Sequence, residues 1–168
     1  CMFSLTAPWM IERSVTGAVS ERMGNRHPRH VPQNCFRCAG DDAFLHIAAT
    51  DDTMWTRLCR AIDRPDWEHD ATLAAASGRR LREAEIESGI EAWTQQRDAD
   101  AAMQSLQAQG IAAGVVRSPY DLVEDPHLQA RGFWQRSERV FSGTYRHSSL
   151  AYRCENGPFS LRRPAPTL

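Results

Sequence analysis

Two histidines and two cysteines near the start of the chain supply the donor atoms that tetrahedral zinc prefers. They are His27 and His30, followed by Cys35 and Cys38. Structural zinc sites usually separate their two ligand pairs by about a dozen residues or more, and here the pairs nearly touch. Cys35 and Cys38 also fall on opposite faces if their segment is a strand, because side chains alternate along a strand. We therefore expect no metal ligands here, and ordinary loop histidines with strand cysteines instead.

The loop from Arg22 to His30 gathers groups that bind anions. It holds three arginines and two histidines around Gly24, Asn25 and Pro28. Guanidinium groups bind carboxylates and phosphates through paired hydrogen bonds, and the glycine, asparagine and proline give the loop a fixed irregular turn. A solvated basic linker is the other interpretation of the same residues.

Two pairs of neighbouring carboxylates offer acid/base chemistry. Asp41-Asp42 fits a hairpin turn and Asp51-Asp52 fits the start of a helix. Both positions favour aspartate for its local hydrogen bonds, so we assign these residues structural roles. The chain also lacks a Gly-x-Ser-x-Gly elbow and a glycine-rich dinucleotide fingerprint, and we name no catalytic residue in it.

Composition places the chain among globular proteins, with 42% hydrophobic and 24% charged residues. All twenty basic residues are arginine, which excludes a lysine Schiff base and a P-loop. The net charge is +3 over residues 1–40, −9 over 41–130 and +5 over 131–168, a pattern that argues against a nucleic-acid partner. No apolar run is long enough for a membrane span. The five cysteines and the missing secretory signal indicate reduced thiols and a cytoplasmic protein.

The hydrophobic pattern predicts an α+β fold with three layers over residues 33–130 and a linker over residues 15–32. The expected strands are 34–39, 43–49 and 111–116, with shorter pieces at 133–135 and 149–153. A helix capped by Asp51 should place Trp55, Leu58, Cys59 and Ile62 on one apolar stripe. Further helices are expected over 78–95 and from Asp98 to Gly110, with helical turns at 119–123 and 126–130.

Several blocks of the sequence stand in an order that resembles class III coenzyme A transferases (the CaiB/BaiF type). The blocks are Gly24-Asn25-Arg26-His27-Pro28, residues 35–41, residues 55–67, Trp93-Thr94 with Arg97-Asp98, and residues 110–133. The last one resembles a family segment that ends in Asp-Pro-His-Leu-x-Ala-Arg-Gly-Phe. This is the family of formyl-CoA transferase, carnitine CoA-transferase and α-methylacyl-CoA racemase. The resemblance covers nearly the whole chain from about residue 17.

The resemblance implies a small α+β domain with flanking linker segments, taken from the C-terminal part of a larger enzyme. Residues 1–32 would lead from an N-terminal Rossmann-like domain outside this chain, residues 33–132 would form the small domain, and residues 133–168 would return toward the large domain. In the family the large domain carries a catalytic aspartate, which forms an aspartyl-CoA thioester while CoA moves between carboxylic acids. Two chains interlock as a homodimer, and a CoA thioester is the substrate, with no covalently bound cofactor.

The same resemblance places Gly24, Asn25, Arg26 and His27 in a loop that faces the active site. Some transferases carry a run of glycines here that closes over the aspartate. This chain instead has Arg-His-Pro-Arg-His at residues 26–30, so the flexibility that glycines provide is missing. Ala112 and Val115 replace two family prolines, which leaves the substrate open. An acyl-CoA racemase, or a stand-alone zinc-binding or interaction module, is the alternative to the transferase.

Overall fold

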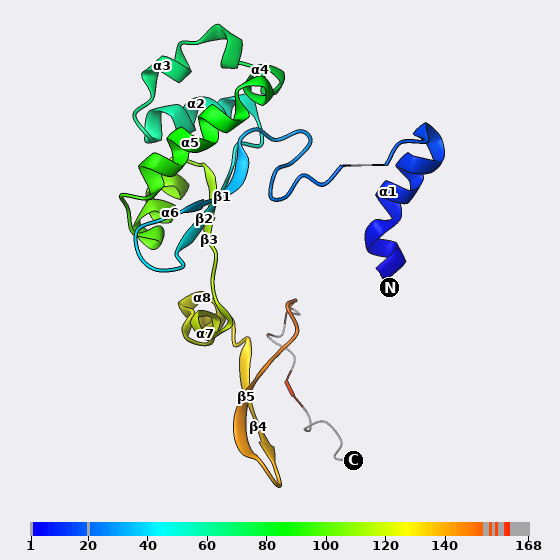
Figure 1. The fold of residues 1–168 in the computed structure, drawn as a ribbon. Coiled ribbons are helices and arrows are strands. Elements are labelled where there is room, and N and C mark those ends of the chain that lie inside the picture. The colour runs from blue at the N-terminus through cyan, green and yellow to red at the C-terminus, as the bar shows by residue number, and fades with distance from the viewer. Residues whose placement is uncertain (1, 20, 153–154, 156, 158–159, 162–168) are drawn as a thin grey trace. The chain divides into compact units, whose positions relative to one another are not determined.

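The computed structural model describes residues 2–19, 21–152, 155, 157 and 160–161. The chain divides into two compact units, Cys1–Val116 and Arg117–Leu168. Both contain helices and antiparallel strands, which confirms the expected α+β class (Figure 1). The division falls after Val116, inside the domain that we predicted over residues 33–132.

A three-stranded sheet in the order β1-β2-β3 forms the centre of the first unit. Its strands are β1 (Gln33–Arg37), β2 (Phe44–Ala48) and β3 (Ala112–Val115), and both neighbouring pairs are antiparallel. The turn between β1 and β2 places Gly40 at φ 109° and Asp42 at φ 50°. These left-handed values favour glycine and tolerate aspartate, so the predicted hairpin and the structural role of Asp42 are confirmed.

One face of the sheet packs against helices and forms the core. Leu45 and Ile47 are fully buried on it, together with Phe36. The helices are α2 (Asp52–Ala61), α5 (Glu83–Thr94) and α6 (Ala99–Ala108), and the predicted stripe Trp55, Leu58, Cys59 and Ile62 is buried with them. Alternate sheet residues such as Arg37 and His46 are exposed or half-buried on the other face. Within the described residues the sheet and these three helices form two packed layers.

Caps set the ends of these helices as predicted. The Asp51 carboxylate accepts a hydrogen bond from the Met54 amide at 2.7 Å, and the Asp98 carboxylate accepts one from the Ala101 amide at 3.0 Å. Gly110 follows α6 at φ 72°. Side-chain oxygens at these positions satisfy amides that have no partner in the first helical turn.

The segment between α2 and α5 differs from the sequence prediction. Pro65 begins the short helix α3 (Pro65–Glu68), since proline fits the first turn of a helix, and the 3-10 turn η1 (Ala71–Leu73) follows. The helix predicted over 78–95 is two helices, α4 (Ala76–Leu81) and α5, separated at Arg82. The backbone of Arg82 has φ −117° and ψ 23°, which are not helical values, so the helix is interrupted there.

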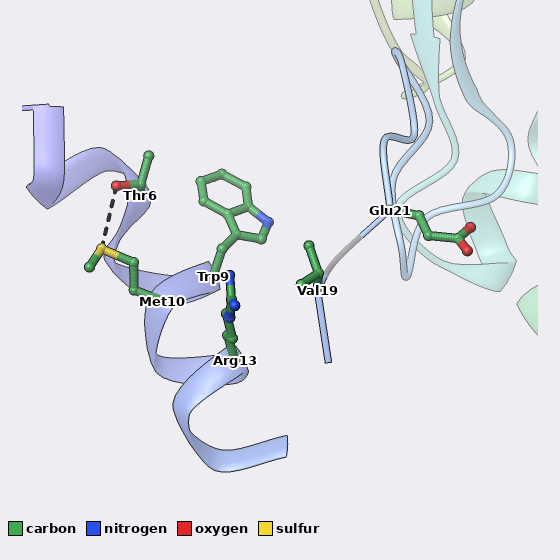
Figure 2. Close-up of a pocket in the computed structure, with 6 residues that line it drawn as sticks. All are labelled: Thr6, Trp9, Met10, Arg13, Val19 and Glu21. Atoms are coloured by element: carbon green, nitrogen blue, oxygen red, sulfur yellow. Dashed lines mark hydrogen bonds between the residues drawn. The ribbon is translucent and has the colours of Figure 1, made fainter. Parts of the chain in front are cut away.

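Helix α1 (Met2–Thr16) was not among the predicted helices, and it extends two residues into the segment 15–32 that was predicted as a linker. Several of its apolar side chains are exposed, among them Leu5, Trp9, Ile11 and Val15. Figure 2 shows Trp9, Met10 and Arg13 on α1 with Val19 and Glu21, which line an open groove of about 480 Å³. No helix among the described residues is long and apolar enough to cross a membrane.

The second unit contains two short helices and a hairpin. Helix α7 (Pro119–Glu124) and helix α8 (Pro126–Ala130) each start with proline, as predicted. Strand β4 (Trp134–Arg139) pairs with β5 (Gly143–Ser148). The predicted piece 133–135 overlaps β4. The piece 149–153 is not a strand over residues 149–152, and Arg153 lies outside the described residues. Polar side chains along β5 hide its strand pattern.

Candidate functional site: an anchored basic loop

The loop from Met23 to His30 begins with a tight turn at the predicted glycine. The Arg26 amide donates to the Met23 carbonyl at 3.1 Å, and Gly24 lies at φ 61° between them. A positive φ is strained for residues with a Cβ, so glycine suits this position. Gly24 and Asn25 are both exposed. The turn sends Arg26 away from the following residues and toward α5.

Arg26 is bound by carboxylates of α5 and is not a free anion-binding group. Its Nε donates to Glu87 Oε1 at 2.9 Å, and its Nη2 donates to the other oxygen of the same carboxylate. A second carboxylate oxygen, Glu83 Oε2, lies 3.7 Å from Arg26 Nε. Asn34 at the start of β1 also donates to Glu87 Oε1, at 2.8 Å. The loop, the first strand and α5 therefore meet at one half-buried carboxylate, that of Glu87.

Electrostatics favour the charged forms of this pair. Burial works against the Glu87 carboxylate, but hydrogen bonds from Arg26 and Asn34 outweigh it, so the pKa of Glu87 is lowered. The hydrogen bond to Glu87 raises the pKa of Arg26. Both groups are ionised near neutral pH, and the contact is a charge-assisted, two-bonded pair.

His27 is held in place by its neighbours. Its Nδ1 accepts hydrogen bonds from the amides of Arg29 and His30, both at 3.2 Å, and its ring stacks on that of His30 with the centroids 4.0 Å apart. Arg80 of α4 donates to the His27 carbonyl and also to Glu83 at 2.8 Å. Burial, then the charges of His30, Arg29 and Arg80, lower the pKa of His27. The neutral ring with an unprotonated Nδ1 is the form that this loop requires.

The predicted residues Gly24, Asn25, Arg26 and His27 therefore lie on one loop that is fixed to α4 and α5. The loop presents His27, half-buried, and the exposed Arg29, while Arg26 neutralises Glu87. Their role toward a ligand stays a prediction. Asn34, Arg80, Glu83 and Glu87 complete the cluster. Sequence reasoning missed them because the contacts join residues 53 to 61 positions apart.

The four zinc donors do not converge on one point of the fold. Cys38 is buried in the core, Cys35 lies on the other face of the sheet, and both are free thiols, as the strand alternation predicted. His30 Nδ1 lies 3.2 Å from Gln33 Oε1. Over the described residues no group of three or more His, Cys, Asp and Glu side chains is arranged to hold a metal ion.

A buried arginine ties the loop's far end to the helices, and no sequence signal pointed to it. Arg79 is only 1% exposed. Its Nε donates to the Val31 carbonyl at 2.6 Å, its Nη1 to the Leu73 carbonyl at 2.9 Å, and its Nη2 to Asp52 at 2.7 Å. Asp52 is thus an ion-pair partner in addition to its place in the first turn of α2.

The fold is the one seen in a protein whose crystal structure is described as a CaiB/BaiF family protein from Brucella suis. The TM-score is 0.81 at 24% identity, over all of this chain and 43% of that one. The family model described as CoA-transferase family III matches residues 1–168. The chain belongs to this family, as its sequence blocks predicted.

Curated relatives of the chain are CoA-transferases. The succinyl-CoA–D-citramalate CoA-transferase of Chloroflexus aurantiacus is 33% identical over 120 residues, which are 71% of this chain and 30% of that protein. The formyl-CoA:oxalate CoA-transferase of Rhodopseudomonas palustris is 27% identical over 88% of this chain and 35% of its own length. The chain thus spans about a third of these two relatives.

Proposed function

We propose that this chain is the small-domain part of an acyl-CoA:carboxylate CoA-transferase. The observation that carries the proposal is the family match over residues 1–168, together with curated relatives that transfer CoA. The relatives described above are named as transferases, which favours transfer over racemisation. The catalytic aspartate would lie on a large domain outside these 168 residues, as the family resemblance implies.

The acceptor class follows from the relatives' names. D-citramalate and oxalate are both dicarboxylic acids, and a third relative, from Haloarcula marismortui, is named a succinyl-CoA:mesaconate CoA-transferase. We therefore assign a dicarboxylate as acceptor and a short acyl-CoA as donor. A homodimer, a cytoplasmic location and no nucleic-acid or membrane partner belong to the same proposal.

The anchored loop has a defined part in this function. Arg26 is bound to Glu87 and the His27 carbonyl is bound to Arg80, so the loop acts as a fixed wall beside the substrate. A hinged lid needs residues with free backbone rotation, which the glycine-rich loops of some family members supply. His27 and Arg29 are the groups that this wall offers to a carboxylate or a phosphate.

The 168-residue chain by itself tests where the nucleophile lies. Incubated with succinyl-CoA or formyl-CoA and a dicarboxylic acid, it should produce no new CoA thioester when the mixture is resolved by chromatography. Transfer that disappears when one of the chain's own aspartates is changed to asparagine would place the nucleophile inside these residues and overturn the proposal.

A further inference from the structure

Cys35 and His46 form a thiol–imidazole pair on the sheet face away from the helices. The Cys35 Sγ lies 3.4 Å from His46 Nδ1. The two residues stand directly opposite each other on β1 and β2, which fixes their side chains on the same face. Both residues are half-buried, so part of each is exposed to solvent. Cys38 and Cys59 are buried in the core and lack this access.

The neighbourhood of the pair leaves room for a small ligand. Gly114 of β3 stands opposite His46, and a Cβ built there meets no atom within 4 Å. Arg37 lies two residues after Cys35 and therefore on the same face. Its guanidinium carbon is 4.9 Å from the centroid of the Phe44 ring. A thiol, a base, an open position and a cation thus share one side of the sheet.

The pair is set up for base-assisted attack and not for a resting thiolate. Burial raises the pKa of the Cys35 thiol, so the neutral thiol is the ground state. In the tautomer that carries its proton on Nε2, the His46 ring has a free Nδ1 lone pair facing the sulfur. A base in this position raises the rate of attack by a weakly ionised nucleophile.

We infer that Cys35, with His46 as its base, is an acyl-acceptor site for acyl-CoA thioesters. The Cys35 sulfur attacks the thioester carbonyl carbon while the thiol proton passes to His46 Nδ1. The bond between the carbonyl carbon and the CoA sulfur then breaks, and the proton moves from His46 to the departing CoA thiolate. One thioester replaces another, so the step needs no oxidant or reductant. The choice of donor rests on the proposed function, whereas the thiol–imidazole chemistry does not.

Acetyl-CoA and the 168-residue chain test this site by peptide mapping. Cleavage after arginine places Cys35 on the peptide 30–37 and Cys38 on the peptide 38–57. We expect an acetyl group on Cys35 and none on Cys38, and we expect Cys35→Ser to abolish it. His46→Asn should slow acetylation of Cys35 about 100-fold, within the usual range for a general base. Acetylation by this chain is scored on the peptide, so it succeeds or fails independently of CoA transfer between carboxylates.

Two results overturn the inference. One is the absence of acetyl on Cys35, and the other is an equal rate in wild type and in a folded His46→Asn chain. If Cys38 becomes labelled in His46→Asn, that variant has unfolded and the pH profile of the wild type decides. A rate that rises where an imidazole loses its proton supports the site. A rate that rises only at the higher pH where the thiol ionises overturns it.

Discussion

Removing the charge of Glu87 should destabilise the first unit far more than the same change at a neighbouring glutamate. Glu87 has a side chain that is 14% exposed and accepts from Arg26 twice and from Asn34 once. Glu87→Gln keeps the size but replaces one accepting carboxylate oxygen with an amide NH2 group, which donates and cannot accept, and it removes the charge. Hydrogen bonds to charged groups contribute about 1.5 to 3 kcal/mol, so we expect a loss of about 2 kcal/mol in the free energy of unfolding.

Glu85→Gln is the matched control on the same helix. Glu85 pairs with Arg82, but its side chain is 52% exposed, and exposed pairs contribute at most about 1 kcal/mol. Urea unfolding followed by tryptophan fluorescence compares the two variants with the wild type. Glu87→Gln should also speed tryptic cleavage after Arg26, because the Arg26 side chain is no longer held by the carboxylate. Equal losses in the two variants, or no change in cleavage, would refute the anchoring of the loop.

Three further predictions concern the interior and the loop. Arg79→Met should lower the free energy of unfolding in urea by about 3 kcal/mol or more, because it leaves the buried carbonyls of Val31 and Leu73 without donors. Arg79→Lys should recover only part of this loss, and a near-neutral Arg79→Met would contradict the prediction. Gly78→Ala should lower the free energy of unfolding by at least about 3 kcal/mol, since the added Cβ would lie 1.7 Å from the Thr72 carbonyl oxygen. Gly114→Ala, the control, should not destabilise the protein, because nothing lies within 4 Å of its Cβ. Similar unfolding midpoints for the two variants would contradict the close packing at Gly78. The pKa of His27 lies below its ordinary value of 6.5, so its contribution to stability is complete above pH 6.5 and is lost as pH falls through the folded value. In an NMR titration the amides of Arg29 and His30, which donate to His27 Nδ1, should shift together with the His27 ring, and a midpoint above 6.5 would contradict this.

Local rules predicted most of the first unit. The caps Asp51 and Asp98, the stop at Gly110 and the stripe from Trp55 to Ile62 were all readable, because each depends on residues within one or two helical turns. The turn from Gly40 to Asp42 was readable for the same reason. The break at Arg82 was missed because the apolar spacing on either side of it still fits one helix.

Contacts between distant residues were beyond the reach of sequence patterns. From the sequence, Arg26 is expected to be solvated or to bind an anion, but in the fold it is paired with Glu87. Arg79 has the sequence context of an exposed helix residue, yet it is buried. The pairing of Cys35 with His46 depends on strand register, which the hydrophobic pattern alone leaves open. The solvent-facing side of the sheet likewise depends on which elements pack against the strands, and the hydrophobic pattern does not specify this.

A domain exchange tests the central claim most directly. The segment of the Chloroflexus aurantiacus transferase that matches this chain would be replaced by the 168 residues, and transfer of CoA from succinyl-CoA to D-citramalate would be measured by chromatography. The original enzyme is the positive control, and a chimera in which the aspartate proposed as the nucleophile of the large domain is changed to asparagine is the negative control. We predict that the folded chimera transfers CoA and that the asparagine variant does not. A folded chimera that binds succinyl-CoA yet transfers no CoA would contradict the assignment of this chain as a CoA-transferase small domain.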